Sequence, residues 1–162
     1  MPNTYLQAAC LGVIAGMRSM GAPALVSDRL ARTPSGAPEG SPLRWLGTAK
    51  TAQVFKILAA GEIVGDKLPR TPARTAPGPL SARLLSGALS GAALCAAGGK
   101  PPSAGAAVGA LGALAGTFAF YHLRRRLGQA TGLPDPIVAV AEDALAYGGG
   151  WLVLQPESSG RK

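Results

Sequence analysis

Five apolar segments, rich in alanine, leucine and glycine, alternate with polar stretches along the chain. A helix needs about 20 apolar residues to cross a bilayer. The last three segments reach that length, and the first two fall short of it. The pattern predicts an all-α protein, a polytopic membrane helix bundle with about five membrane segments, some of them short or broken. The segments are residues 5–20, 52–66, 80–98, 103–123 and 135–154.

The first segment changes character where Arg18 follows the apolar run AACLGVIA. Ser19 comes next, and Pro23 follows within a few residues. A secretory signal peptide has a basic n-region, which this segment lacks. We therefore expect a short helix that ends at Arg18 in the interior of a bundle, with Pro23 redirecting the chain.

Composition agrees with a membrane protein. Hydrophobic residues make up 48% of the 162 positions and charged residues 15%, against about 25% charged in a typical soluble domain. The mean hydropathy is +0.23. Lysine and arginine outnumber aspartate and glutamate by 16 to 8, but they lie at the ends of apolar segments, as in membrane proteins. Nucleic-acid binding is disfavoured, because the chain has no basic stripe with interleaved aromatic residues.

The two cysteines, Cys10 and Cys95, both lie in apolar segments. We expect free buried thiols rather than a disulfide, and two cysteines are too few for a zinc site. The sequence predicts neither a metal ion nor a cofactor.

Glycines mark one face of the fourth segment. They recur at intervals of three and four residues, which places them on a single side of a helix. Small residues at such intervals let helix backbones approach closely in lipid. The expected role is packing within one subunit, and a homo-oligomer interface is the alternative. The glycines are Gly105, Gly109, Gly112 and Gly116, with Gly87 and Gly91 in the third segment.

A short internal match suggests a repeat. Residues 11–20 read LGVIAGMRSM and residues 111–120 read LGALAGTFAF. An acidic segment follows each, and their alignment pairs Glu62 with Glu142. With the third segment as a linker, the first two segments and the last two would form an inverted repeat. Inverted repeats with broken helices are typical of transporters, whose sites lie near the membrane midplane.

The topology has alternatives. With five spans, lysine and arginine are almost balanced between the two faces, so positive-inside bias gives no direction. The second segment also contains Lys56, Glu62 and Asp66, which are costly in a lipid-facing span. That segment could be re-entrant or interfacial, and insertion in both orientations is a further alternative. The repeat favours five spans.

Two pairs of acidic residues stand inside apolar segments. Glu62 and Asp66 are four apart and share a helical face, whereas Glu142 and Asp143 are adjacent and about 100° apart, so only one of the two can join Glu62 directly. Arg18 and Arg83 lie within or at the edge of other apolar segments. Charges inside a membrane are paired or hydrated and mark function. We expect these groups around a polar cavity on a substrate, ion or proton path; the alternative is a structural salt-bridge network.

Several sequence blocks resemble a known family. The blocks AGMRSMGAPA, GEIVGDKLPRTPARTAP and GLPDPIVAVAEDALA, with the glycine-rich helices between them, are similar to the bacterial membrane proteins grouped as domain of unknown function 4126. The resemblance covers about residues 8–150. It implies a small multi-pass protein of the bacterial inner (cytoplasmic) membrane and supplies no activity. The motif positions are Arg18, Ser19, Glu62, Asp66, Lys67, Pro69, Arg74, Asp135, Glu142 and Asp143.

The domain organisation is simple. Residues 1–155 are expected to form a single transmembrane domain and residues 156–162 a flexible C-terminal tail. Residues 29–50 are expected to be a variable polar insert without a motif.

Enzyme readings find little support. Lys67 and Arg74 in KLPRTPAR have the spacing of a lipid-phosphatase motif, but Thr75 stands where that motif has proline. The chain has one histidine, His122, where the motif needs two. No Ser/His/Asp set and no phosphate loop are present. A carboxylate-only or Mg²⁺-dependent lipid-phosphate enzyme using Glu62, Asp66 and Arg74 is the less favoured alternative.

The sequence therefore predicts a small transporter or channel for an ion or small solute. Arg18 and Arg74 would attract an anion or hold a carboxylate, and Glu62 and Glu142 would be proton or cation sites. Asp66 would pair with a basic neighbour. The expected partners are the lipid bilayer and a small solute, ion or proton. The alternative is a structural or lipid-binding membrane protein whose charges hold the fold.

Overall fold

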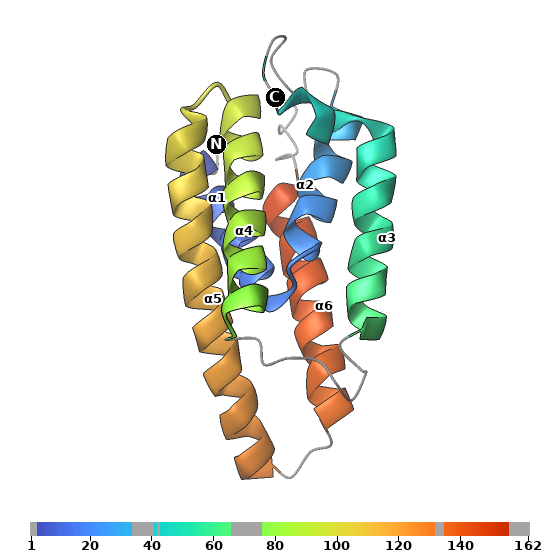
Figure 1. The fold of residues 1–162 in the computed structure, drawn as a ribbon, viewed down its shortest axis with the longest axis vertical. Helices are drawn as coiled ribbons and strands as arrows, with labels where there is room; N and C mark the ends of the chain where they lie inside the picture. Colours follow the sequence, from blue (N-terminus) through green and yellow to red (C-terminus); the bar gives the residue numbers. More distant parts are fainter. Residues whose placement is uncertain (1–2, 34–40, 42, 66–75, 132–134, 156–162) are drawn as a thin grey trace, which may run out of the picture.

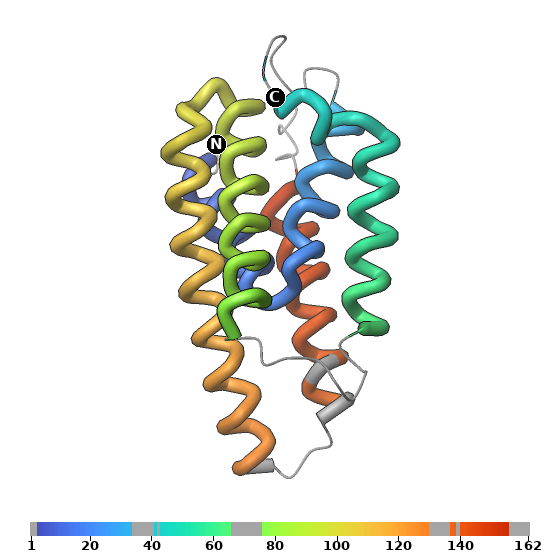
Figure 2. The backbone as a smooth tube through the Cα atoms, in the orientation of Figure 1, coloured from blue at the N-terminus to red at the C-terminus, as the bar shows by residue number. Residues whose placement is uncertain are grey.

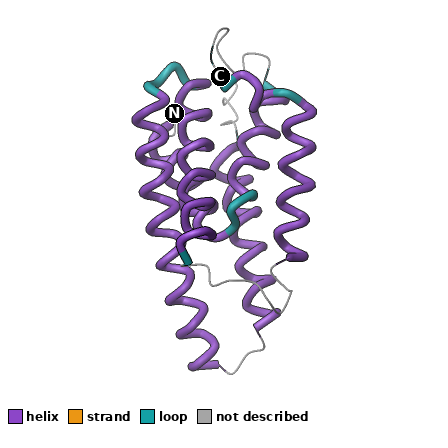
Figure 3. The backbone as a smooth tube through the Cα atoms, viewed as in Figure 1, coloured by secondary structure: helices purple, strands orange, loops and turns teal. Residues whose placement is uncertain are grey.

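The fold is all-α, as predicted. The computed structural model describes residues 3–33, 41, 43–65, 76–131 and 135–155, and these contain helices and no strand (Figures 1 and 3). The elements are α1 (Thr4–Met17), α2 (Gly21–Arg32), the 3-10 helix η1 (Arg44–Gly47), α3 (Ala49–Gly65), α4 (Pro77–Ala97), α5 (Pro102–Thr131) and α6 (Asp135–Leu154).

The first two helices form a hairpin that enters the bundle and turns back inside it. Helix α1 descends between α4, α5 and α6, the chain turns at residues 18–20, and α2 returns to the end where α1 began (Figure 2). The Gln7 side chain near the start of α1 donates a hydrogen bond to the Val153 carbonyl near the end of α6, at 2.8 Å. Both described ends of the chain therefore lie at the same end of the bundle.

This hairpin changes the expected topology. The five-span bundle is not confirmed, because only α4 and α5 among the described helices are long and apolar enough to cross a membrane. The chain turns back inside the bundle at residues 18–20, within the first apolar segment. A re-entrant or interfacial second segment stays a prediction. Helix α2 was not foreseen: Pro23 is its third residue, within the first turn, where a helix does not need the proline N–H. Residues 29–50 also contribute to the fold, through the end of α2 and the buried Leu46 of η1.

Glycines set the distance between α1 and α5. A Cβ atom at Gly12 would lie within 3.0 Å of Gly112, and one at Gly16 within 3.0 Å of Gly116. The contact moves from Gly12 to Gly16 along α1 and from Gly112 to Gly116 along α5, so the two helices run parallel. An inverted repeat would require these two helices to run in opposite directions. The inverted repeat is therefore not supported. The matched glycines instead face one another across a single helix pair, which accounts for their similarity by packing alone.

Helix α4 packs on α5 in the same way but in the opposite direction. Gly87 lies against Gly109, and Gly91 lies against Gly105, so α4 and α5 are antiparallel. Packing within one subunit, the expected role of these glycines, is confirmed. The alternative of a homo-oligomer interface stays a prediction.

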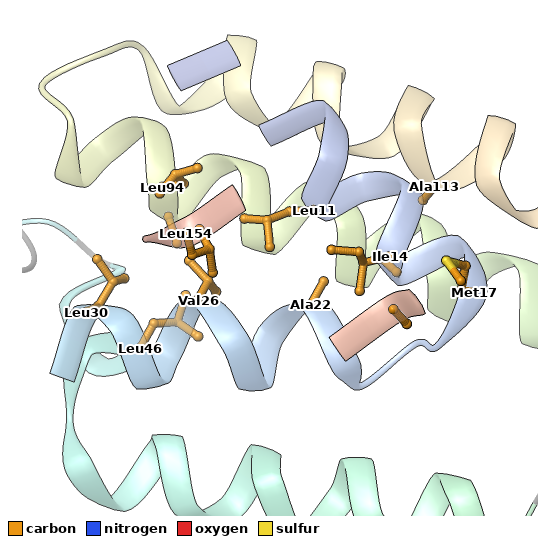
Figure 4. Packing of buried hydrophobic residues seen from close by; sticks show 13 residues of the cluster. Leu11, Ile14, Met17, Ala22, Val26, Leu30, Leu46, Leu94, Ala113 and Leu154 are labelled. Atoms are coloured by element: carbon orange, nitrogen blue, oxygen red, sulfur yellow. The ribbon is translucent and has the colours of Figure 1, made fainter. Parts of the chain in front are cut away.

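Large side chains are distributed unevenly between core and surface. The core contains side chains of the hairpin, including Leu11, Ile14 and Val26 (Figure 4), while many large apolar side chains of the described residues lie on the outside. Helices α4 and α5 are long and apolar enough, by length and composition, to cross a membrane. The exposed apolar side chains on α3 to α6 include Val54, Ile57, Leu58, Val64, Leu85, Leu111, Leu114, Phe118, Leu123, Ile137, Val140, Leu145, Trp151 and Leu152.

Candidate functional site

The candidate site is built around the hairpin tip, residues 18–20. Helix α1 ends because Arg18 adopts an extended conformation, with φ −139° and ψ 112°. Helix α2 then begins at Gly21. A chain that turns inside a bundle buries backbone N–H and C=O groups that no helix satisfies. Side chains from α3 and α4 provide partners for these backbone groups, and a side chain from α6 binds the Arg18 guanidinium.

Glu62 of α3 binds the N–H groups of the tip. One carboxylate oxygen accepts hydrogen bonds from the Ser19 N–H at 2.8 Å and the Ser19 hydroxyl at 2.9 Å. The other accepts from the Met20 N–H at 2.8 Å. These groups precede the first turn of α2, where the helix dipole favours a negative charge. Glu62 therefore occupies an anion-binding position at the start of a helix.

Arg18 points toward α6 and forms an ion pair with Asp143. The distance from Nε to Oδ1 is 2.6 Å, and the two side chains are 2% and 18% exposed. A charge buried this deeply is tolerated when it is paired and hydrogen-bonded. The expectation that Arg18 ends a short helix in the bundle interior is confirmed.

Arg83 of α4 binds the carbonyl groups at the end of α1. Its Nη1 donates to the Gly16 carbonyl at 2.5 Å and to the Met17 carbonyl at 3.3 Å. The last carbonyls of a helix lack internal partners and carry partial negative charge, so a buried guanidinium stabilises them. One helical turn further along α4, the Ser86 hydroxyl donates to the Ser19 carbonyl.

These contacts define what we call the tip cluster. It joins the ends of α1 and α2 to side chains of α3, α4 and α6, and it contains two acidic and two basic side chains. Arg83 binds the last carbonyl groups of α1, and Glu62 binds the N–H groups that precede the first turn of α2. Its members are Arg18, Ser19, Glu62, Arg83, Ser86 and Asp143.

Not every predicted residue joins the tip cluster. Glu142 is buried elsewhere on α6 and forms an ion pair with Arg124 of α5, at 3.6 Å. Of the two neighbouring acids, Asp143 is the one that binds Arg18 at the hairpin, because the rotation of about 100° per residue turns the two side chains in different directions. Asp135 begins α6, but its side chain is outside the described part. Asp66, Lys67 and Arg74 also lie outside the described residues.

Sequence reasoning missed other polar neighbours. Ser86 follows Arg83 by three residues, and Tyr147 follows Asp143 by four, so each shares a helical face with a predicted residue. The Tyr147 ring lies beside Gly21, and its buried hydroxyl has no hydrogen bond to any described residue. Thr117 of α5 donates to the Ala113 carbonyl at 2.8 Å. Helical spacing from the charged residues is the signal that could have identified Ser86 and Tyr147.

A cavity of about 640 Å³ lies at the end of the bundle where α1 begins. It is lined by residues from α1, the second half of α2, the end of α4 and the end of α6. Asp28 stands at its wall and binds Lys56 of α3 at 2.5 Å and Arg32 at 2.9 Å. Burial alone would raise the pKa of the Asp28 carboxyl, but hydrogen bonds and charges from Lys56 and Arg32 lower it overall.

Metal ligation and known relatives add no further assignment. Among the described residues, no group of three or more histidine, cysteine, aspartate or glutamate side chains could hold a metal ion. Comparison of the chain with protein-family models, with curated proteins and with solved structures found no match. The family resemblance seen in the sequence therefore stays a prediction.

Proposed function

We propose that the protein is a multi-pass protein of the inner membrane. Two apolar helices of sufficient length and the apolar outer surface of α3 to α6 support the proposal. A soluble protein rarely exposes this many large apolar side chains to water. The protein should remain with the membrane fraction after a carbonate wash and require detergent for extraction. Recovery in the soluble fraction would contradict the proposal.

We propose further that the protein moves an ion or small solute across that membrane through the tip cluster. The observation that carries the proposal is the re-entrant hairpin, whose turn presents buried charges in the middle of the bundle. Transporter sites are commonly formed by interrupted helices, whose ends supply partial charges to the solute. Ionisable groups at such a depth are costly, and a hydrated path explains why a chain would keep them.

Glu62 is the group that we assign to coupling. It comes from α3, which packs mainly on α2 and η1 rather than on the three other long helices. Added Cβ atoms at Gly61 and Gly65 would meet no atom of another described residue within 4 Å, so no described helix packs closely against this face of α3. Protonation of Glu62 removes the charge that binds the Ser19 and Met20 N–H groups. The tip would then be free to bind an anion or water in place of the carboxylate.

A proteoliposome assay tests this role. Purified protein is reconstituted with a pH-sensitive dye inside the vesicles, and proton entry is driven by a potassium gradient with valinomycin. Wild type should admit protons faster than protein-free vesicles. Glu62→Gln keeps the size of the side chain but cannot exchange a proton, so its flux per folded molecule should fall to the protein-free level. Glu142→Gln, a buried neutralisation outside the tip cluster, should retain flux per folded molecule.

A structural scaffold is the second candidate, and the completeness of the hydrogen bonding around the tip favours it. Every side chain of the tip cluster has a partner within the chain. If the charges only hold the fold, wild type should show no flux above protein-free vesicles. Glu62→Gln would then act on the free energy of unfolding alone, through the Met20 N–H that loses its acceptor.

A further inference from the structure

The cavity at the end of the bundle carries an excess of positive charge. Asp28 is the acidic residue of its described lining, and Arg29 and Arg32 are the basic ones. Asp28 already forms ion pairs with Arg32 and Lys56, so these two cations balance its negative charge. The charge of Arg29 is left without a counter-charge in this lining.

Arg29 is also left without hydrogen bonds on one side of its guanidinium. Its Nη1 atom is buried and has no hydrogen-bond partner among the described residues. Burial lowers the pKa of Arg29, which means that the surroundings disfavour its charge. A guanidinium nevertheless stays protonated in proteins, and a buried donor without an acceptor is costly. An anion in the cavity would remove both penalties.

The size and the walls of the cavity restrict the anion. A volume of about 640 Å³ lies within the range of small-molecule sites and far exceeds one bare ion. Leu94, Trp151 and Leu154 supply apolar wall next to the arginines. A ligand that fits combines a charged oxyanion with an apolar part. Guanidinium groups match the oxygens of phosphate groups with paired hydrogen bonds.

We propose that this cavity binds a phosphate-bearing ligand, with the phosphate on Arg29 and the apolar part against α4 and α6. The phosphate can belong to an anionic lipid headgroup or to a soluble phosphate. Trp151 is exposed beside the cavity, as expected for an aromatic side chain at a membrane interface. This site is separate from the tip cluster and does not depend on transport.

Thermal unfolding in an uncharged detergent tests the site with three probes. They are inorganic phosphate, a short-chain phosphatidylglycerol and the phosphatidylcholine of the same chain length, all at constant ionic strength. The variants are Arg29→Gln, which removes the charge, and Arg29→Lys, which keeps the charge without the paired donors. Arg44→Gln is the matched control, because Arg44 is an exposed arginine of η1 outside the cavity lining.

For wild type, phosphate or phosphatidylglycerol at about 100 times its dissociation constant should raise the melting temperature by about 5 °C, while phosphatidylcholine should not. Arg29→Gln should weaken the apparent affinity at least about 10-fold, Arg29→Lys less, and Arg44→Gln not at all. A response to phosphate alone assigns a soluble ligand, and a response to phosphatidylglycerol alone assigns a lipid headgroup.

Three outcomes would overturn the proposal. One is that neither anionic probe stabilises wild type. Another is that phosphatidylcholine stabilises it equally. The third is that folded Arg29→Lys and Arg44→Gln respond alike and as strongly as wild type, whether or not Arg29→Gln folds. Because the readout is ligand binding, none of these outcomes bears on proton flux through the tip cluster.

Discussion

Arg18 and Asp143 form a buried ion pair that joins the turn of the N-terminal hairpin to the last helix, 125 residues further along the chain. The pair closes the bundle around the tip, because α1 and α6 are the first and last helices of the described fold. Its removal should therefore affect the whole fold as well as the site.

Arg18→Gln should lower the free energy of unfolding by about 3–5 kcal/mol, since it leaves the Asp143 carboxylate without its cation. Asp143→Asn should cost a similar amount. The double variant should lose less than the sum of the two, because neither charge is then left unpaired. Denaturant unfolding in detergent measures all three. Strictly additive losses would show that the pair does not contribute as a pair.

The close packing of α1 and α4 on the glycines of α5 predicts that a larger side chain at these glycines lowers stability. A Cβ at Gly109 would lie within 3.0 Å of the Gly87 backbone. Gly109→Ala should therefore lower the free energy of unfolding by about 1–3 kcal/mol through overpacking. Gly128→Ala, on the same helix, meets no atom within 4 Å and should raise stability by up to about 1 kcal/mol. Equal melting temperatures for the two variants would contradict the close helix packing.

Two serines on one face of α4 should behave in opposite ways. The Ser86 hydroxyl binds the Ser19 carbonyl, so Ser86→Ala should cost about 1–3 kcal/mol by leaving that carbonyl unsatisfied. The Ser90 hydroxyl is buried and has no hydrogen-bond partner among the described residues. Ser90→Ala should therefore be neutral or stabilising. A loss for Ser90→Ala as large as for Ser86→Ala would indicate an internal water at Ser90.

The Asp28 carboxylate predicts a pH dependence. Its pKa in the folded protein lies below the ordinary 3.8, because Lys56 and Arg32 outweigh the effect of burial. The stability that it contributes is thus present above the unfolded pKa and is lost as the pH falls through the folded one. Because the pair is partly exposed, Asp28→Asn should cost less than about 1 kcal/mol at neutral pH. The gap to wild type should close as the pH falls through the folded pKa of Asp28, which lies below 3.8, and a gap that widens in acid would contradict this origin.

Part of the site could be predicted from the sequence. An arginine followed by proline inside an apolar run indicated where α1 ends, and the cost of buried charge indicated that Arg18 has an acidic partner. Glu62 was identified because an acid within an apolar helix needs a partner. The identity of the partners could not be predicted, since contacts between α1 and α6 depend on how each helix is rotated in the bundle.

The misassignments have physical causes. The match between residues 11–20 and 111–120 reflects the small residues that two parallel helices need where they touch, and packing of this kind imitates a repeat. Helix α2 was missed because its exposed end is charged and its first turn contains Pro23, so its sequence lacks a continuous apolar run. The chain turns back inside the bundle because this second, shorter helix follows α1 directly.

Access of water to the hairpin tip tests the central claim most directly. In a background with Cys10 and Cys95 replaced by alanine, Ser19→Cys is reconstituted and treated with a membrane-impermeant thiol reagent. Thiols react as thiolates, which form in water and not in lipid. Leu111→Cys is the control, because Leu111 is 65% exposed on the apolar surface of α5. The account predicts that Ser19→Cys is modified with loss of proton flux while Leu111→Cys is not modified; a Ser19→Cys thiol as unreactive as that of Leu111→Cys would contradict it.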